Sequence, residues 1–258
     1  MDGVILAAGK GTRMRPYSNA VNKEMSLIGP CPVIEYCVRA LASCGVRRVY
    51  VVLSEGKHQI VEFLRSGADL GVDVAYIYQD MEKGKGTAKA LATAEPWVRG
   101  DFMLVYGDSF FHPTDFFSEM VRFHEEEGAD VTMGVYMMGD HKDYGVVKLR
   151  GDEVVDVLEK ASEADAAQAR VEGKYPVNLG PMLLNREIFD FIGRTEVSPS
   201  GEHWLTDTIR LMVRGGRRVK GFPIPSDVFW RDIGRMEHRM EAEQYFLRVI
   251  TVSNQIAK

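Results

Sequence analysis

Glycines and positively charged residues cluster directly after the first apolar segment of the chain. They stand together with no acidic residue among them, at Gly9, Gly11, Arg13, Arg15 and Lys23. Glycine lets the backbone turn tightly and approach a ligand closely, so that amide N–H groups can point at phosphate oxygens, and the cations add full charge. The segment therefore predicts polyphosphate binding. The competing interpretation is a glycine-rich turn with solvated cations.

Two familiar phosphate-binding motifs do not describe this segment. It contains no GxxxxGK[ST], and GKGTRM (residues 9–14) lacks the third glycine of the dinucleotide fingerprint and contains an arginine instead. Neither a P-loop nor a dinucleotide-binding turn is therefore expected here.

The elements that must position this segment alternate between strand and helix. Apolar runs expected as strands lie at residues 3–8, 48–53, 73–78, 102–106 and 130–138, with helical periods between them at 32–44, 57–66, 87–95 and 114–127. After residue 140 come a hairpin over 144–149 and 153–160, a polar excursion at 161–174, a strand at 177–184, a helix at 204–215, a strand at 218–224 and a last helix with an apolar stripe of Met236, Met240, Leu247 and Ile250.

This succession predicts an α/β fold. We expect three layers, with a Rossmann-like, mainly parallel but mixed sheet covered by helices on both faces, because the strands are near-continuous apolar runs. A chain of 258 residues without repeats or linkers is expected to form one domain over 1–258. Ligands of open α/β sheets bind beyond the carboxyl ends of the strands, where residues 8–16 lie.

Bulk composition narrows the class of protein. Hydrophobic residues make up 45% of the chain and charged residues 27%, and the net charge of -5 argues against a nucleic-acid binder. The first apolar run is too short for a signal peptide or a membrane span, so we expect a cytoplasmic protein without membrane contact. Cys31, Cys37 and Cys44 have no metal-binding spacing, so reduced, buried thiols are expected.

A family resemblance covers nearly the whole chain. LAAGKGTRMRP (residues 6–16) resembles the loop of the sugar-1-phosphate nucleotidyltransferases, and AVNKEM (20–25) resembles a segment of the glucose-1-phosphate thymidylyltransferases. Further motifs follow in the family's order: YGD at 106–108, YGVV at 144–147, EK at 159–160, SPSGEHWLTD at 198–207 and WRDIG at 230–234. The resemblance implies the nucleotide-diphospho-sugar transferase type of fold, with a nucleotide-binding half over 1–140, a sugar-binding half over 141–234 and a C-terminal helix over 235–258.

The implied reaction joins an NTP and a sugar 1-phosphate to give an NDP-sugar and pyrophosphate. The attacking phosphate oxygen is already ionised, so positioning and charge neutralisation must supply the catalysis. Arg13 is expected to hold the β and γ phosphates and Lys23 the α phosphate, whereas Arg15 either contributes or only raises the local potential. Asp108 and Asp232 each end a strand and are expected to share one Mg²⁺, the alternatives being a helix cap and a surface turn.

The resemblance also implies the residues that contact the nucleotide. They are Leu6, Ala7, Ala8, Gly9, Gly11, Thr12 and Gln79, with either Gly84 or Gly86 beside the base. The amide of Gln79 offers a donor and an acceptor, which suits the edge of a pyrimidine.

The residues expected around the sugar come from the second half of the chain. They are Tyr144, Gly145, Glu159, Lys160, Asn178 and Gly180. Glu202 and Asp207 either shape the same pocket or cap the following helix. Two positions depart from the family pattern, since Ser109 stands where asparagine is common and Ala161 where proline is common. The six histidines match no catalytic position and are expected at the surface or behind the ligands.

The expected activity is therefore transfer from dTTP or UTP to a sugar 1-phosphate such as glucose 1-phosphate. Two alternatives stay open: a catalytically silent nucleotide-sugar sensor, and a cytidylyltransferase acting on an alcohol phosphate. No hexapeptide repeats are present, so a transferase without a β-helix acyltransferase domain is expected. The family often assembles through its C-terminal region, which makes a homo-oligomer possible.

Overall fold

A mixed sheet forms the centre of the protein, whose structure is a computed structural model that describes residues 1–256. The sheet has nine strands in the order β5 (Asp73–Tyr78), β4 (Arg48–Leu53), β1 (Asp2–Leu6), β6 (Phe102–Tyr106), β11 (Tyr175–Leu184), β8 (Val131–Met138), β12 (Val219–Pro223), β10 (Glu153–Leu158) and β9 (Gly145–Arg150). The strands from β5 to β6 pair in parallel, whereas β11 runs antiparallel to both of its neighbours. The expected α/β class and mixed sheet are confirmed.

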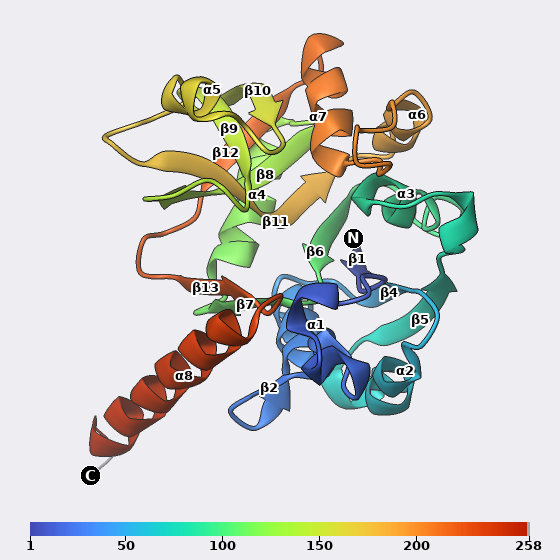
Figure 1. Ribbon diagram of the computed structural model, residues 1–258, viewed down its shortest axis with the longest axis vertical. Coiled ribbons are helices and arrows are strands. Elements are labelled where there is room, and N and C mark those ends of the chain that lie inside the picture. The colour runs from blue at the N-terminus through green and yellow to red at the C-terminus, as the bar shows by residue number, and fades with distance from the viewer. Residues whose placement is uncertain (257–258) are drawn as a thin grey trace.

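Helices cover both faces of this sheet (Figure 1). One face packs against α1 (Val33–Ser43), α2 (His58–Leu64) and α4 (Phe116–Glu127), and the other against α3 (Thr87–Ala92), α6 (Ile188–Ile192) and α7 (Leu205–Arg214). Strand β1 shows why residues 4–6 are all apolar: Ile5 belongs to the first core, and Val4 and Leu6 belong to the second. Such burial on both faces produces the continuous apolar runs in the sequence.

Two short two-stranded ribbons were not predicted from the sequence. Strand β7 (Ser109–His112) pairs with β13 (Phe229–Asp232), and β2 (Leu27–Ile28) pairs with β3 (Cys31–Pro32). In the first ribbon Ser109 is the pairing partner of Asp232, although the two residues are far apart in the sequence. This pairing brings the end of β6 and the segment WRDIG together.

Short helices complete the described elements. The polar excursion contains α5 (Glu163–Ala167) and an isolated bridge between Val171 and Lys174. Single 3-10 turns occur at Thr12–Met14, Tyr17–Asn19, Lys23–Met25, Ala68–Leu70 and Met81–Lys83. Three of these turns carry the loop from Thr12 to Met25, so it is a series of tight turns between β1 and β2.

Helix α8 (Met236–Ile256) leaves the body beside β13 and extends away from it (Figure 1). Phe246 packs over Gly29, and Tyr245 stacks on Phe229 with ring centroids 4.1 Å apart. Met240, expected in the apolar stripe, is instead 55% exposed. The side chain of Ile250 and residues 257–258 lie outside the described part of the chain.

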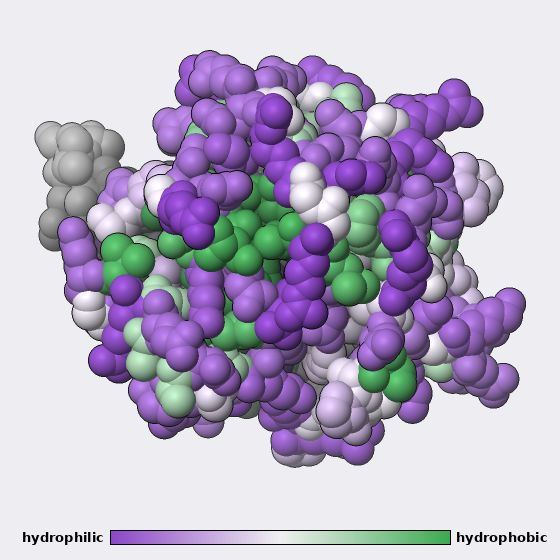
Figure 2. All heavy atoms as spheres, turned by 90° about the horizontal axis from the view of Figure 1, so that it is seen from above, coloured by the Kyte–Doolittle hydropathy of each residue, from purple (hydrophilic) through white to green (hydrophobic). Residues whose placement is uncertain are grey.

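Within residues 1–256, none of the helices combines the length and the apolar character that a bilayer span requires. Viewed from above, the protein is mostly hydrophilic, and hydrophobic residues gather in the centre of this face behind a hydrophilic rim (Figure 2).

The cysteines are free thiols. Cys37 is buried, as expected, whereas Cys31 and Cys44 are only half-buried. Burial raises the pKa of the Cys44 thiol to about 11, so it stays protonated at neutral pH.

Candidate active site

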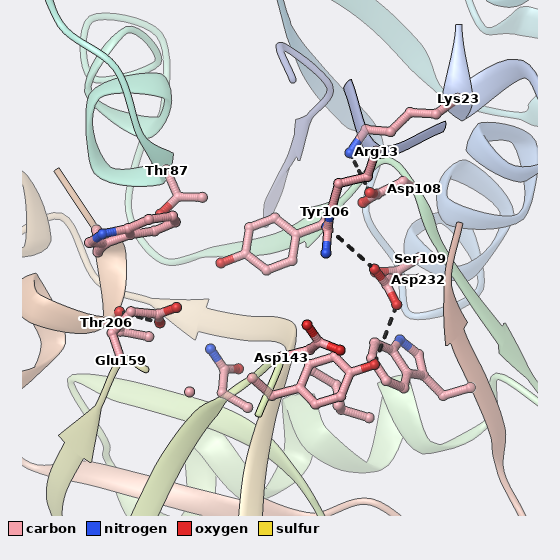
Figure 3. A pocket seen from close by; sticks show the side chains of 16 residues that line it. Arg13, Lys23, Thr87, Tyr106, Asp108, Ser109, Asp143, Glu159, Thr206 and Asp232 are labelled. Carbon is pink, nitrogen blue, oxygen red and sulfur yellow. Dashed lines mark hydrogen bonds and ion pairs between the residues drawn. The ribbon is translucent and has the colours of Figure 1, made fainter. Parts of the chain in front are cut away.

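Three cavities lie around the loop that follows β1. Cavity A, of about 330 Å³, is lined by residues that include Arg13, Tyr106, Asp108, Glu159, Thr206 and Asp232 (Figure 3). Cavity B, of about 380 Å³, is lined by residues that include Leu6, Gly9, Thr12, Gln79, Gly86 and Tyr106. Cavity C, of about 640 Å³, is lined by residues that include Lys10, Arg15, Ser18, Ser54, His58 and Tyr78. Lys23 lines all three.

The ammonium group of Lys23 is bound to Asp108 at the point where the cavities meet (Figure 3). Both side chains are largely buried, with 16% and 13% of their surface exposed. Burial opposes the charge of Lys23, but the charges of Asp108 and Glu24 outweigh it and raise its pKa. Lys23 is therefore a permanent cation in this place. Gly9 lies against it, since a Cβ there would be 3.4 Å from the ammonium nitrogen.

Asp232 faces the same cavity from the end of β13. Its Oδ2 is 3.8 Å from the guanidinium of Arg13, and its Oδ1 accepts hydrogen bonds from Tyr144 (3.4 Å) and from Nδ1 of His238 (2.7 Å). Burial opposes its ionisation, but the hydrogen bond and charge of His238 and the charge of Arg13 hold the pKa of Asp232 below its usual value. The carboxylate is thus ionised and fixed in orientation.

The tautomer of His238 follows from its contacts. Its Nδ1 is 3.0 Å from the backbone carbonyl oxygen of Asp232 and 2.7 Å from the Oδ1 of the same residue. A carbonyl oxygen can only accept, so Nδ1 carries the proton. His238 lies in the first turns of α8, and the sequence spacing alone did not connect it to the site.

The two carboxylates suit a hard divalent cation. Asp108 directly precedes Ser109, which pairs with Asp232. The backbone carbonyl of Asp108 also accepts a hydrogen bond of 2.7 Å from the backbone N–H of Ile233, which follows Asp232. Within residues 1–256, no group of three or more potential ligand side chains occurs. Mg²⁺ is usually held by one or two carboxylates together with substrate phosphates, so two acids facing one cavity fit this ion.

Cavity B receives part of the segment that follows β1. Leu6, Ala8, Gly9 and Thr12 line it, whereas Ala7 is buried in the core and Gly11 adopts a left-handed turn with φ of 65°. Such a φ favours glycine.

Of the two glycines considered for the base, only Gly86 lines cavity B. Gly84 does not line this cavity, and its carbonyl accepts a hydrogen bond of 3.2 Å from the side-chain amide of Gln79. One of the two N–H donors of the Gln79 amide is thus engaged by the protein. Glu202 also lines cavity B, and Asp207 lies in the first turn of α7.

The second half of the chain contributes the far wall of cavity A. Glu159 accepts a hydrogen bond of 2.9 Å from Thr206, and burial raises the pKa of its carboxyl. Tyr144, Gly145 and Asn178 line the same cavity.

Two residues expected at the sugar lie against residues that line cavity A and do not line it themselves. Lys160 adopts a φ of 48° and its ammonium lies 5.2 Å from the ring centre of Trp204, outside the lining of cavity A. Gly180 lies behind Tyr106, since a Cβ there would be 2.3 Å from that ring.

Several lining residues were missed by the sequence analysis. Thr87, Tyr106 and Trp204 line both cavity A and cavity B, and Asp143 and Trp230 line cavity A. Three of these five residues lie within the motifs YGD, SPSGEHWLTD and WRDIG, so the family resemblance could have indicated them.

A buried ion pair holds the loop that carries Lys23. The Nζ of Lys57 is 2.7 Å from the Oε2 of Glu24, and the two side chains are only 5% and 1% exposed. The second oxygen of Glu24 has no hydrogen-bond partner among the described residues. This pair ties the residue after Lys23 to the loop between β4 and α2.

Comparison with known proteins identifies the class. A profile of the nucleotidyl transferase family matches residues 2–248. The chain therefore belongs to the nucleotidyl transferase family.

Individual relatives differ in how much of their length is matched. The UTP–glucose-1-phosphate uridylyltransferase AglF of Haloferax volcanii is 32% identical over 251 residues, which cover 95% of this chain and 96% of that protein. The bifunctional protein GlmU of Methanococcus vannielii is 29% identical over 254 residues, or 97% of this chain. The chain spans about half of that relative, 56% of its length.

Solved structures share the fold. A putative glucose-1-phosphate thymidylyltransferase from Bacillus anthracis in complex with a sucrose superposes with a TM-score of 0.83 at 24% identity, covering 95% of both chains. A UDP-glucose pyrophosphorylase complexed with UDP-glucose gives a TM-score of 0.82 at 21% identity, covering 96% of this chain and 98% of that one.

Proposed function

We propose that the protein transfers a nucleotidyl group from UTP or dTTP to a sugar 1-phosphate, with glucose 1-phosphate as the first candidate. The products are an NDP-sugar and pyrophosphate. The observation that carries this proposal is the position of Lys23, a buried cation bound to Asp108 where cavities A and B meet. AglF, named as a UTP–glucose-1-phosphate uridylyltransferase, supports the choice of nucleotide and sugar because its match spans almost both chains.

Positioning and charge supply the catalysis in this proposal. The sugar phosphate enters cavity A and the nucleoside enters cavity B, so that the α phosphate lies beside Lys23. An oxygen of the sugar phosphate attacks the α phosphorus while the bond to the β phosphate breaks, and the electron pair leaves with pyrophosphate. Lys23 and Arg13 stabilise the negative charge that develops on the oxygens. No proton has to be moved, because the attacking oxygen is already ionised.

Asp108 and Asp232 are proposed to hold Mg²⁺ together with the phosphates. When bound, the ion neutralises phosphate charge and helps to align the triphosphate. Tyr144 and His238 keep Oδ1 of Asp232 occupied, which leaves Oδ2 directed toward the cavity and Arg13.

The sugar is proposed to bind at the far wall of cavity A. Glu159 can accept hydrogen bonds from two sugar hydroxyls, and Gly145 allows close approach of the ring because no side chain intervenes. Thymine and uracil differ by one methyl group, which is worth only about 1–3 kcal/mol in an apolar contact, so both nucleotides are proposed as substrates.

Pyrophosphate release tests this proposal. Purified protein with Mg²⁺ is assayed with UTP, dTTP and CTP against glucose 1-phosphate and other sugar 1-phosphates. Turnover with UTP or dTTP is expected, and Lys23→Met is expected to lower kcat about 10²- to 10³-fold, as for loss of one preorganised charge. Lys142→Met, at an exposed lysine outside the three cavities, is the matched control. Absence of turnover with every nucleotide and sugar phosphate refutes the proposal.

A further inference from the structure

Trp204 lies where the two substrate cavities meet. Its side chain is half-buried and lines both cavity A and cavity B. The proposed transfer depends on charges beside the phosphates and on hydrogen-bond partners for hydroxyl groups. An indole adds something that none of these groups supplies, a large and flat apolar face.

The backbone that carries Trp204 is fastened to the loop before α3. The N–H of His203 donates a hydrogen bond of 2.9 Å to the carbonyl of Lys85, and the carbonyl of His203 accepts one of 3.0 Å from the N–H of Ala88. A Cβ on Gly86 would be 2.3 Å from the carbonyl oxygen of His203, so the two segments are in close contact. The position of Trp204 relative to cavity B is therefore fixed.

Two contacts orient the indole of Trp204. Its N–H donates a hydrogen bond of 3.1 Å to the hydroxyl of Ser198, and the ammonium of Lys160 lies over the ring, 5.2 Å from its centre. Lys160 lines neither cavity A nor cavity B, so the face of the ring away from Lys160 is left for a ligand. A ring held in this way loses little conformational entropy when a ligand binds.

The contacts of its neighbours favour the sugar as the ligand of Trp204. Thr206 donates a hydrogen bond of 2.9 Å to Glu159, the residue proposed to bind sugar hydroxyls, and Lys160 follows Glu159 in the chain. Figure 3 shows Glu159 and Thr206 on one side of cavity A and Asp108 on the other. Both the segment of Trp204 and the cation on its ring thus belong to the proposed sugar wall.

A pyranose ring has the shape and the chemistry that an indole face recognises. Its equatorial hydroxyls point outward around the edge of the ring, and C–H groups occupy its two faces. The negative face of an aromatic ring attracts such C–H groups, and burying them removes apolar surface from water. An acid such as Glu159 suits the edge of the same sugar, because a carboxylate accepts hydrogen bonds from hydroxyls.

We propose that Trp204 is a specificity-determining residue of the sugar site. Its indole packs on the C–H face of a pyranose 1-phosphate while Glu159 binds the hydroxyls at the edge. This inference deepens the proposed nucleotidyl transfer and rests on it. Ser198 and Lys160 act through the indole, as positioning residues that keep its free face toward the sugar.

Steady-state kinetics with UTP, glucose 1-phosphate and Mg²⁺ test the role of the indole. For Trp204→Leu we expect the KM for glucose 1-phosphate to rise about three- to tenfold, the range for losing one aromatic contact, while the KM for UTP stays unchanged. Trp204→Phe keeps an aromatic face and is expected to retain most of the affinity. Ser198→Ala leaves the indole in place without its acceptor, and we expect a rise of about twofold in the same KM.

The matched control is Trp97→Leu, at a tryptophan that is 56% exposed and lines none of the three cavities. Thermal unfolding checks that the variants are folded. Three results overturn the role of Trp204: an unchanged KM for glucose 1-phosphate in Trp204→Leu, an equal or larger rise in the KM for UTP, or a Trp204→Phe variant no better than Trp204→Leu.

A second variant keeps the test decisive if Trp204→Leu does not fold. Ser198→Ala then takes its place, and a KM for glucose 1-phosphate equal to the wild-type value overturns the proposal. Failure of the wild type to turn over any sugar 1-phosphate instead refutes the nucleotidyl transfer itself, so the two failures are distinguishable.

Discussion

The buried pair of Lys57 and Glu24 gives the sharpest prediction about stability. Lys57→Met removes the ion-pair partner of Glu24, whose other carboxylate oxygen has no hydrogen bond among the described residues. Breaking a buried pair on one side costs about 3–5 kcal/mol. The charge of Lys23 still compensates part of the charge of Glu24, so the lower end of this range is expected. A whole protein is stable by only about 5–15 kcal/mol, so we expect a large loss.

The pH dependence of this loss follows from the pKa of Glu24. Burial raises that pKa, against the charges of Lys23 and Lys57. Removal of Lys57 raises it further. A carboxyl whose pKa is higher in the folded state destabilises the fold above its unfolded pKa of about 4.3, and this penalty disappears as the pH falls toward that value. The deficit of Lys57→Met is therefore expected to shrink on acidification.

Thermal unfolding at several pH values measures both effects. Since about 2–4 °C of melting temperature correspond to 1 kcal/mol for a chain of this size, the melting point at neutral pH is expected to fall by about 6–20 °C. The double variant Glu24→Gln with Lys57→Met carries no buried charge at this place, and we expect it to regain most of the stability and to lose the pH dependence. A single variant that unfolds like the wild type, or a double variant no better than the single one, contradicts the reasoning.

Three further predictions concern the site. Chelation of divalent cations is expected to abolish turnover and added Mg²⁺ to restore it; turnover that survives chelation contradicts the proposed role of Asp232. His238→Ala is expected to weaken Mn²⁺ binding, measured by calorimetry, about tenfold, as for loss of a ligand-orienting hydrogen bond, whereas His238→Asn, which keeps a donor near Nδ1, is expected to retain most of the affinity. Gly180→Ala is expected to cost about 1–3 kcal/mol in thermal unfolding, because its Cβ meets Tyr106 at a φ of 109°. Gly173→Ala, with a φ of 79° and open space around it, isolates the backbone contribution.

Candidate site residues could be predicted from the sequence where they end a regular strand. Asp108 could be singled out because it follows a buried apolar run, and the carboxyl ends of such strands meet at one edge of a sheet. Asp232 was singled out through the motif WRDIG of the family resemblance, because β13 lies outside the nine-stranded sheet. What joins them is the pairing of β7 with β13, and strands of four residues at the edge of a fold carry too little periodicity to be predicted.

Contacts that depend on the path of the backbone could not be predicted. His238 reaches Asp232 because the chain turns at residues 233–235, between β13 and α8, and no spacing rule encodes that turn. Lys160 is expected at the sugar phosphate, and it lines a small neighbouring cavity together with Glu159, with its ammonium 5.2 Å from the ring centre of Trp204. Its left-handed φ of 48° could not be read from sequence spacing.

The charges around Lys23 compensate one another in the free protein. Lys23 is bound to Asp108, and Arg13 lies 3.8 Å from Asp232, so two cations and two acids form two pairs. In the proposed reaction, a metal–triphosphate complex would supply the opposite charge for each of these groups. Its phosphate oxygens would attract the two cations, and its divalent ion would attract the two acids. Binding would then exchange partners without leaving any buried charge alone, which a site with cations only could not do before its substrate arrives. This exchange explains how buried charges of both signs can be present at once in a stable fold.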